Sequence, residues 1–160
     1  MNPNHHRRNN VNESRSKQCQ RTTPCPECPF NRKVAPGTLG GSPVQTYVGQ
    51  AVLPFWLPCH MSPGYKGKVS DPTTTQQCAG AAIFRNNIGV AAKMPAAILS
   101  LPPDRELSFS SLAEFVAHHL QVSVAAVERN LTDEEIRWCA MREASNVNVR
   151  EVKTTNQRWK

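Results

Sequence analysis

The sequence predicts a small, loop-rich α+β domain that is stabilised by a metal and continues into a helical C-terminal part. Three observations lead to this prediction. The 160 residues include 13 prolines and 8 glycines, which favour turns over long regular elements. The hydrophobic fraction of 39% allows only a modest core, and a thin core often needs a metal or a disulfide. From Ser110 onward the pattern becomes that of amphipathic helices.

Residues 1–22 are predicted to be a disordered basic leader, because they are rich in Asn, Arg, Ser, His and Gln and nearly lack apolar side chains. The chain has a net charge of +7, and its basic excess is densest in this leader. Such a segment can screen phosphate groups or can simply be solvated. Its candidate nucleic-acid contacts are Arg7, Arg8, Arg15 and Lys17.

Residues 23–105 are predicted to form a Cys-rich metal-binding domain. Residues 46–60 are aromatic and β-branched but contain two prolines, so short strands or irregular core segments are expected there. The most apolar run, residues 78–101, is expected to be a helix with interruptions near 86–89 and at Pro95.

Four of the six cysteines lie in predicted loops or at element edges beside Pro, His or Gly. Cys25 and Cys28 form a CxxC motif. Cys59 precedes His60, and Cys78 opens the tripeptide Cys-Ala-Gly. Four thiolates that come from three loops suit a tetrahedral Zn²⁺ site or the corners of a 4Fe–4S cluster.

Other uses of these thiols are less favoured but stay open. No secretory signal is recognised, so reducing cytoplasm is expected, where structural disulfides are rare. A thioredoxin-like dithiol needs a strand before the motif and a helix after it, whereas prolines crowd this one. Simple burial of unrelated cysteines is the remaining alternative.

These motifs resemble those of a family of small bacterial and phage proteins of unknown function. The resemblance covers residues 24–119 and rests on the stretches PCPECPF, PG, FWLPCH, QCAGAAIF, IGVAAK and AEFVAHH. The four cysteines and His60 fall on the shared pattern, whereas Ala81 and Ala82 stand where relatives often carry an aromatic residue. The resemblance strengthens the prediction of a metal site and implies no particular activity.

The residues leave the identity of the metal open between zinc, which we favour, and a 4Fe–4S cluster. A closed zinc site suits a thin core. Proline directly after both Cys25 and Cys28 is frequent around iron–sulfur clusters. Adjacent side chains in extended backbone point in opposite directions, so His60 is expected to donate a hydrogen bond to a thiolate, or to replace one cysteine as a ligand, rather than to join Cys59 on one metal.

Residues 106–146 are predicted to form a helical segment, and residues 147–160 a basic tail. Ser111 and Glu114 have the spacing of a capping box, and Ser123 has the character of an N-cap for a second helix.

Residues 114–131 resemble the helix-turn-helix of DNA-binding regulators, in which small Ala117 permits a close crossing and Val127 is buried. Gln121 departs from the Gly usual in the turn, and the exposed face carries little positive charge. An ordinary two-helix corner with His118 and His119 on its surface is the alternative. The residues that would face the major groove are Val124, Ala125, Glu128, Arg129 and Asn130.

No nucleophile elbow, metalloprotease motif, phosphate loop or dinucleotide turn is present, so a non-enzymatic function is expected. The predicted function is that of a metal-stabilised binding protein that contacts DNA, RNA or the transcription machinery, in keeping with a phage factor. The alternatives are an iron–sulfur protein in redox sensing or electron transfer, and an adaptor with a structural zinc that binds a host protein complex. No apolar run predicts a membrane span, and a cytoplasmic location is expected.

Overall fold

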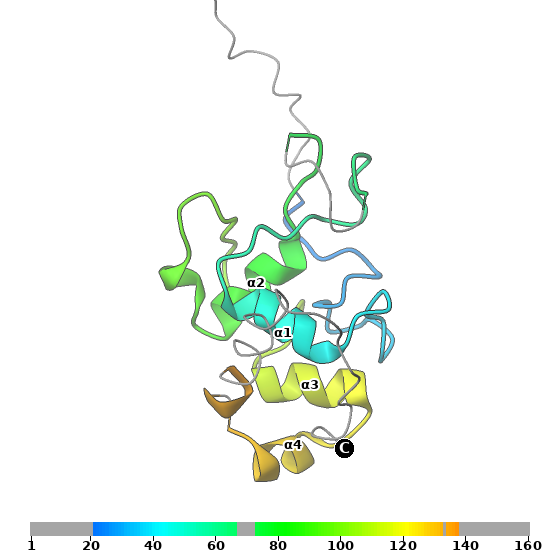
Figure 1. The fold of residues 1–160 in the computed structure, drawn as a ribbon, viewed down its shortest axis with the longest axis vertical. Coiled ribbons are helices and arrows are strands. Elements are labelled where there is room, and N and C mark those ends of the chain that lie inside the picture. The colour runs from blue at the N-terminus through cyan, green and yellow to red at the C-terminus, as the bar shows by residue number, and fades with distance from the viewer. Residues whose placement is uncertain (1–20, 67–72, 133, 138–160) are drawn as a thin grey trace, which may run out of the picture.

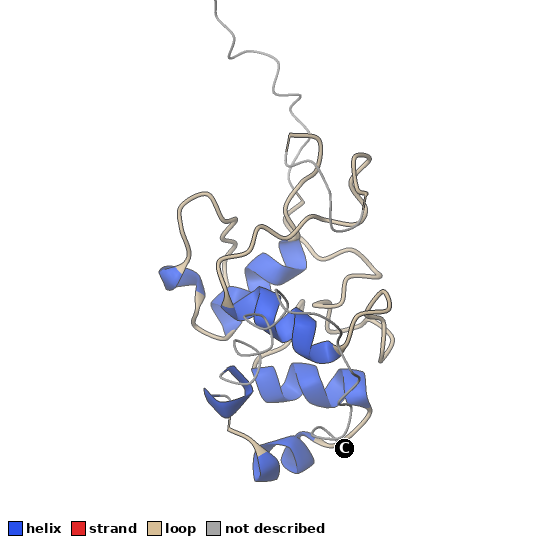
Figure 2. Ribbon diagram, in the orientation of Figure 1, coloured by secondary structure: helices blue, strands red, loops and turns tan. Residues whose placement is uncertain are grey.

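The computed structural model describes residues 21–66, 73–132 and 134–137 of the chain. These residues form a small, largely helical domain with long connecting loops (Figures 1 and 2). Its elements are α1 (Val44–Val52), α2 (Ala79–Asn87), the 3₁₀ helix η2 (Ala91–Lys93), α3 (Leu112–Leu120) and α4 (Val124–Asn130). Within this part of the chain, no helix is both long and apolar enough to span a bilayer.

The β component of the predicted α+β class is almost absent from the described residues. They contain only two isolated antiparallel bridges, Asn31–Ser108 and Pro58–Gln77. Residues 46–60, which were expected to form strands or irregular segments, begin instead inside α1. Buried residues at helical spacing explain this result, because they place one face of α1 in the core and override the β preference of Val and Tyr.

α1 lies between α2 and α3, and α4 packs on α3 (Figure 1). The centre of the molecule is a group of phenyl rings from both predicted segments. Phe30 stacks on Phe84 of α2 and on Phe115 of α3, with 5.4 Å between ring centroids in each pair. Phe84 and Phe115 are 5.3 Å apart, and all three are buried. The Cys-rich half and the helical half therefore share one core.

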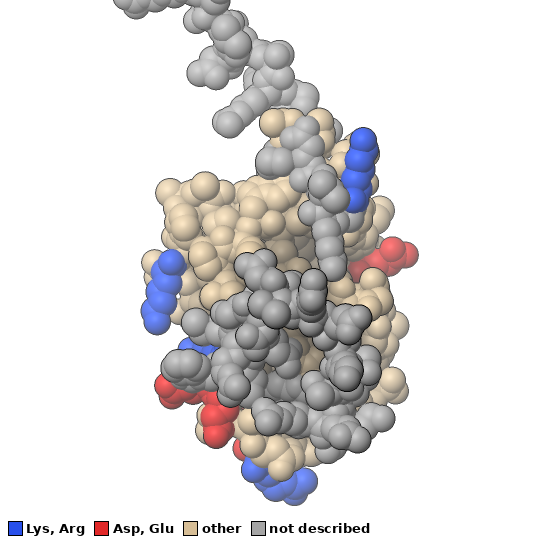
Figure 3. All heavy atoms as spheres, viewed as in Figure 1, with Lys and Arg blue, Asp and Glu red and all other residues tan. Residues whose placement is uncertain are grey.

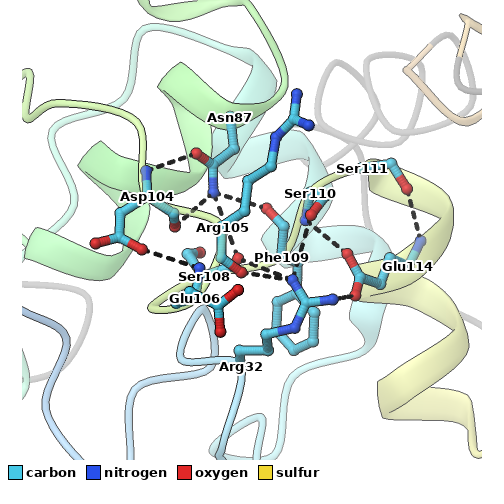
Figure 4. A network of polar contacts seen from close by, with 10 residues as sticks. All are labelled: Arg32, Asn87, Asp104, Arg105, Glu106, Ser108, Phe109, Ser110, Ser111 and Glu114. Atoms are coloured by element: carbon cyan, nitrogen blue, oxygen red, sulfur yellow. Dashed lines mark hydrogen bonds and ion pairs between the residues drawn. The ribbon is translucent and has the colours of Figure 1, made fainter.

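A polar network joins the loop after the CxxC motif to the start of α3 (Figure 4). The guanidinium of Arg32 forms an ion pair with Glu114 and donates to the carbonyl oxygen of Arg105 at 2.6 Å. Glu114 also accepts a hydrogen bond from the Ser110 N–H at 2.6 Å, and Ser111 Oγ accepts the Glu114 N–H at 3.0 Å. The predicted cap by Ser111 is confirmed, whereas the carboxylate of Glu114 accepts the N–H of Ser110 instead of that of Ser111, so the capping box is only half formed.

Asn87 ends α2 and holds the loop that leads to α3 (Figure 4). Its side-chain amide donates to the carbonyl oxygens of Asp104 and Phe109, at 2.9 and 3.0 Å. Its Oδ1 accepts the Asp104 N–H at 2.9 Å. The predicted helix interruption near residues 86–89 is confirmed. Asn87 joins the end of α2 to the loop through these hydrogen bonds.

Candidate metal centre and helical corner

The structure brings the four predicted cysteines into one region. The sulfurs of Cys28 and Cys78 are 3.5 Å apart, and Cys25 Sγ lies 3.6 Å from Nε2 of His60. Cys59 is buried on the segment that pairs with the one leading to Cys78. Burial first, and then the negative charges of Cys78 and Cys25, raise the pKa of its thiol. All four are free thiols.

Short backbone hydrogen bonds place these thiols. In the CxxC turn, the Cys28 N–H donates to the Cys25 carbonyl at 3.1 Å. The Cys59 N–H donates to the Gln76 carbonyl at 2.7 Å, and the Cys78 N–H donates to the Leu57 carbonyl at 2.8 Å. These two bonds flank the Pro58–Gln77 bridge, so the segments that carry Cys59 and Cys78 run antiparallel beside each other.

Each of the four sulfurs receives a backbone N–H from the residue two positions further along the chain. Such donors stabilise a thiolate over a thiol. The donors are Glu27 for Cys25, Phe30 for Cys28, Met61 for Cys59, and Gly80, together with Ala81, for Cys78. The backbone around each of these four cysteines thus offers an N–H to a negatively charged sulfur.

The pKa values of three of these thiols are shifted in different directions. The hydrogen bond from Cys28 is the main cause that lowers the pKa of Cys25 to about 6, and the nearby His60 assists. The pKa of Cys28 is raised by its hydrogen bonds to Cys25 and Cys78 and by burial. The pKa of Cys78 is lowered, mainly by the hydrogen bond from Cys28. Of these three thiols, Cys28 therefore holds its proton most strongly.

The start of α2 approaches the CxxC turn so closely that only glycine fits. A Cβ built on Gly80 would lie 2.5 Å from Cys28 Sγ and 3.2 Å from the Phe30 Cβ. Sequence reasoning did not assign a role to Gly80, although its position directly after Cys78-Ala79 at a helix start was the available signal.

Cys28 and Cys78 form one close pair of thiols, and Cys25 forms a second close pair with the ring of His60. Among the described residues, no three His, Cys, Asp or Glu side chains form a group that could hold a metal ion as they stand. His60 faces Cys25, and its Nε2 is also 3.9 Å from Oε2 of the exposed Glu27. Its two predicted roles, hydrogen-bond donor or replacement ligand, both remain predictions.

The prediction that His118 and His119 are surface residues is wrong for His119. This ring is buried and 4.7 Å from the ring of Phe115. Its Nδ1 accepts the Gly37 N–H at 3.2 Å, so its Nε2–H donates to the Pro29 carbonyl at 2.9 Å. The available signal was its position four residues after Phe115, on the buried face of α3.

α3 and α4 form the corner that resembles a helix-turn-helix. Gln121 adopts the left-handed conformation, with φ 56° and ψ 43°, that glycine would take at the turn. Ser123 Oγ accepts the Ala126 N–H at 3.1 Å, which confirms the predicted N-cap of α4. Ala117 and Val127 are buried at the crossing, as expected.

All five residues predicted to face a DNA groove are exposed on α4: Val124, Ala125, Glu128, Arg129 and Asn130. The Asn130 amide folds back onto the Ala126 carbonyl at 2.8 Å. Basic and acidic side chains are interspersed on the described surface that Figure 3 presents. The predicted leader contacts Arg7, Arg8, Arg15 and Lys17, and the tail at 147–160, lie outside the described residues.

Comparisons of the chain with protein-family models, with curated proteins and with solved structures found no match. The resemblance to the family of small bacterial and phage proteins therefore stays a prediction, and the functional argument rests on the geometry of the site.

Proposed function

We propose that this chain is a non-enzymatic binding protein whose Cys-rich half is held together by one zinc ion bound to the cysteines of the CxxC, Cys-His and Cys-Ala-Gly motifs. One observation carries the proposal. Four thiols lie on three neighbouring segments, and each sulfur receives a backbone N–H from two residues further on. Unrelated buried cysteines have no reason to share this arrangement, whereas thiolate ligands benefit from it at every position.

The separation between two of the sulfurs favours zinc over an iron–sulfur cluster. Zn–S bonds of about 2.3 Å give a tetrahedral edge of roughly 3.8 Å between two sulfurs. The sulfurs of Cys28 and Cys78 are 3.5 Å apart. In a 4Fe–4S cluster each thiolate binds a different iron, and the inorganic core keeps the thiolates further apart.

The fourth ligand is Cys59 in this proposal, and His60 supports Cys25 from outside the ligand set. The Met61 N–H that donates to Cys59 gives that sulfur the same backbone support as the other three. We therefore expect Cys59→Ser to lose zinc and His60→Gln to weaken binding by about 10- to 100-fold, as substitutions of residues that support ligands do. The reverse ranking would make His60 the ligand.

Metal analysis of protein purified without air tests the proposal directly. We expect one zinc per chain and no visible absorption. Cys25→Ser and Cys78→Ser should lose the metal. Cys139→Ser changes a cysteine outside the three motifs, so it is the matched control that should keep the metal. Iron with sulfide would instead support redox sensing or electron transfer. Wild-type protein that carries no metal would overturn the proposal. Equal metal content in all three cysteine variants would also overturn it.

Binding of duplex DNA by the α3–α4 corner is a second candidate function. It is supported by the left-handed Gln121, the capped α4 and the exposure of the five predicted contact residues. The mixed charge of α4 means that non-specific phosphate attraction has to come from elsewhere, and the basic leader is the candidate source.

Salt-dependent binding to a set of duplexes tests this second candidate. Arg129→Ala should lower the binding free energy by about 1–3 kcal/mol for preferred sequences only. Arg7→Ala or Lys17→Ala should weaken binding to all sequences evenly and reduce the slope of log affinity against log salt concentration by about 1. A zinc protein that ignores nucleic acid and retains one host complex in pull-down experiments would support the adaptor instead.

A further inference from the structure

A buried guanidinium lies between the end of α1 and the helix that Cys78 begins. Arg85 is on α2 and is only 2% exposed. Its Nε donates to the Ala51 carbonyl at 3.0 Å, and its Nη2 donates to the carbonyls of Gln50 and Phe55, both at 2.8 Å. Arg85 thus satisfies the last carbonyls of α1 and the chain that continues toward Cys59.

These partners are all neutral. Carbonyl oxygens satisfy the hydrogen-bonding capacity of a guanidinium but leave its full positive charge in the interior, which is unfavourable without a negative group nearby. Among the described residues, no carboxylate forms an ion pair with Arg85. Burial lowers the pKa of Arg85 to about 10, so the side chain still carries its charge at neutral pH.

One of the four thiols lies on the same helix as Arg85. A negatively charged Cys78 raises the pKa of Arg85 and so opposes the larger effect of burial. Cys78 is the N-cap of α2 and Arg85 lies seven residues later, which places both on the same side of the helix after two turns. Four thiolates around one divalent zinc ion leave two negative charges in excess.

We propose that Arg85 is the counter-charge of the metal site, a buried cation that stabilises the zinc–thiolate complex over the metal-free protein. This inference rests on the zinc site proposed above and adds to it a residue that does not touch the metal. It gives Arg85 two distinct contributions: its hydrogen bonds hold the end of α1, and its charge raises the affinity for zinc.

Substitutions that separate charge from hydrogen bonding test the inference. Zinc affinity would be measured by competition with a chromophoric chelator at one fixed pH and ionic strength. Arg85→Gln, which is neutral, is expected to lower the affinity by about 10- to 100-fold. Arg85→Lys keeps the charge but loses the planar fork, so it should stay within about threefold of the wild type while unfolding at a lower temperature.

Arg137→Gln is the matched control. Arg137 Nη2 donates to the Ile88 carbonyl at 3.0 Å, so this arginine also binds the end of a helix, at the opposite end of α2 from Cys78. Its substitution should lower the unfolding temperature and leave zinc affinity unchanged. Affinities would be compared at a temperature where the metal-free variants have the far-ultraviolet circular dichroism of the wild type.

The outcomes separate the two proposals. Wild-type protein that binds no zinc would overturn both. Wild-type protein that binds zinc, with Arg85→Gln equal to it in affinity, would overturn the counter-charge alone. Equal losses in Arg85→Lys and Arg85→Gln would also overturn it, because the charge would then be irrelevant. If the Gln variant does not fold without metal, Arg85→Lys decides: an affinity near that of the wild type supports the inference, and a loss of tenfold or more contradicts it.

Discussion

His119 links the CxxC turn to α3 only while its ring is neutral. Its Nδ1 accepts the Gly37 N–H, and protonation would place two donors opposite each other. Burial is the main cause that lowers the pKa of His119 below its ordinary value of 6.5, and the adjacent His118 adds to the effect. The link is therefore sensitive to acid.

We expect His119 to make the fold less stable as the pH falls below neutrality. Because its folded-state pKa is lowered, its contribution is complete above pH 6.5 and declines as the pH drops from 6.5 toward the folded value. His119→Gln keeps a neutral donor and acceptor, so it should remove this part of the pH dependence. Urea unfolding across this range measures the difference, and parallel curves for the two proteins would contradict it.

Gly80 is required by contact rather than by backbone conformation. In an exposed helix, replacing Gly by Ala stabilises by about 1 kcal/mol. Here the added methyl would lie 2.5 Å from Cys28 Sγ, so we expect Gly80→Ala to destabilise the protein by about 1–3 kcal/mol. The sign of the change in urea unfolding free energy decides, because greater stability would mean that the close approach is absent.

At the residue scale, the sequence could predict which cysteines lie in one region, but not which other residues surround them. Cysteine is rare, and its spacing carries the prediction of one site. Arg85, Gly80 and His119 owe their roles to neighbours that are distant in the chain, so residue type and spacing alone could not reveal them.

At the scale of elements, helices with clear caps were predictable and α1 was not. Ser111 and Ser123 cap α3 and α4 as their sequence context indicates. α1 lacks a side-chain cap and contains Val and Tyr, which favour strands. The signal for a helix was the spacing of Val44, Val48 and Ala51, which share the buried face.

The turn between α3 and α4 provides a test of the helical corner. Gln121 is a non-glycine residue with φ 56°, a conformation that costs about 1–2 kcal/mol for an L-residue. Gln121→Gly should therefore raise the free energy of unfolding by roughly 0.5–1 kcal/mol after the greater chain entropy of glycine is included. Gln121→Ala, which retains a Cβ, is the control and should not stabilise. A destabilising Gly variant would indicate a different turn.

At the scale of the whole molecule, the proposed zinc site and the phenyl core are expected to stabilise different regions. Removal of zinc should loosen the cysteine segments while α3, packed on Phe30 and Phe84, keeps its protection. Hydrogen exchange after chelation should therefore accelerate first at residues 57–61 and 76–80. Simultaneous acceleration in α3 would mean that the zinc and the phenyl core form one cooperative unit.

Phe30 limits how this protein can be divided. Its ring inserts between α2 and α3, directly after the motif that supplies two of the thiols. A fragment that ends near residue 105 would expose to water the faces of Phe30 and Phe84 that pack on Phe115, and an isolated α3–α4 corner would lose both of these partners. Neither half is a transplantable module, so an insertion or a fusion junction placed between them would be selected against, and the two halves should be inherited together.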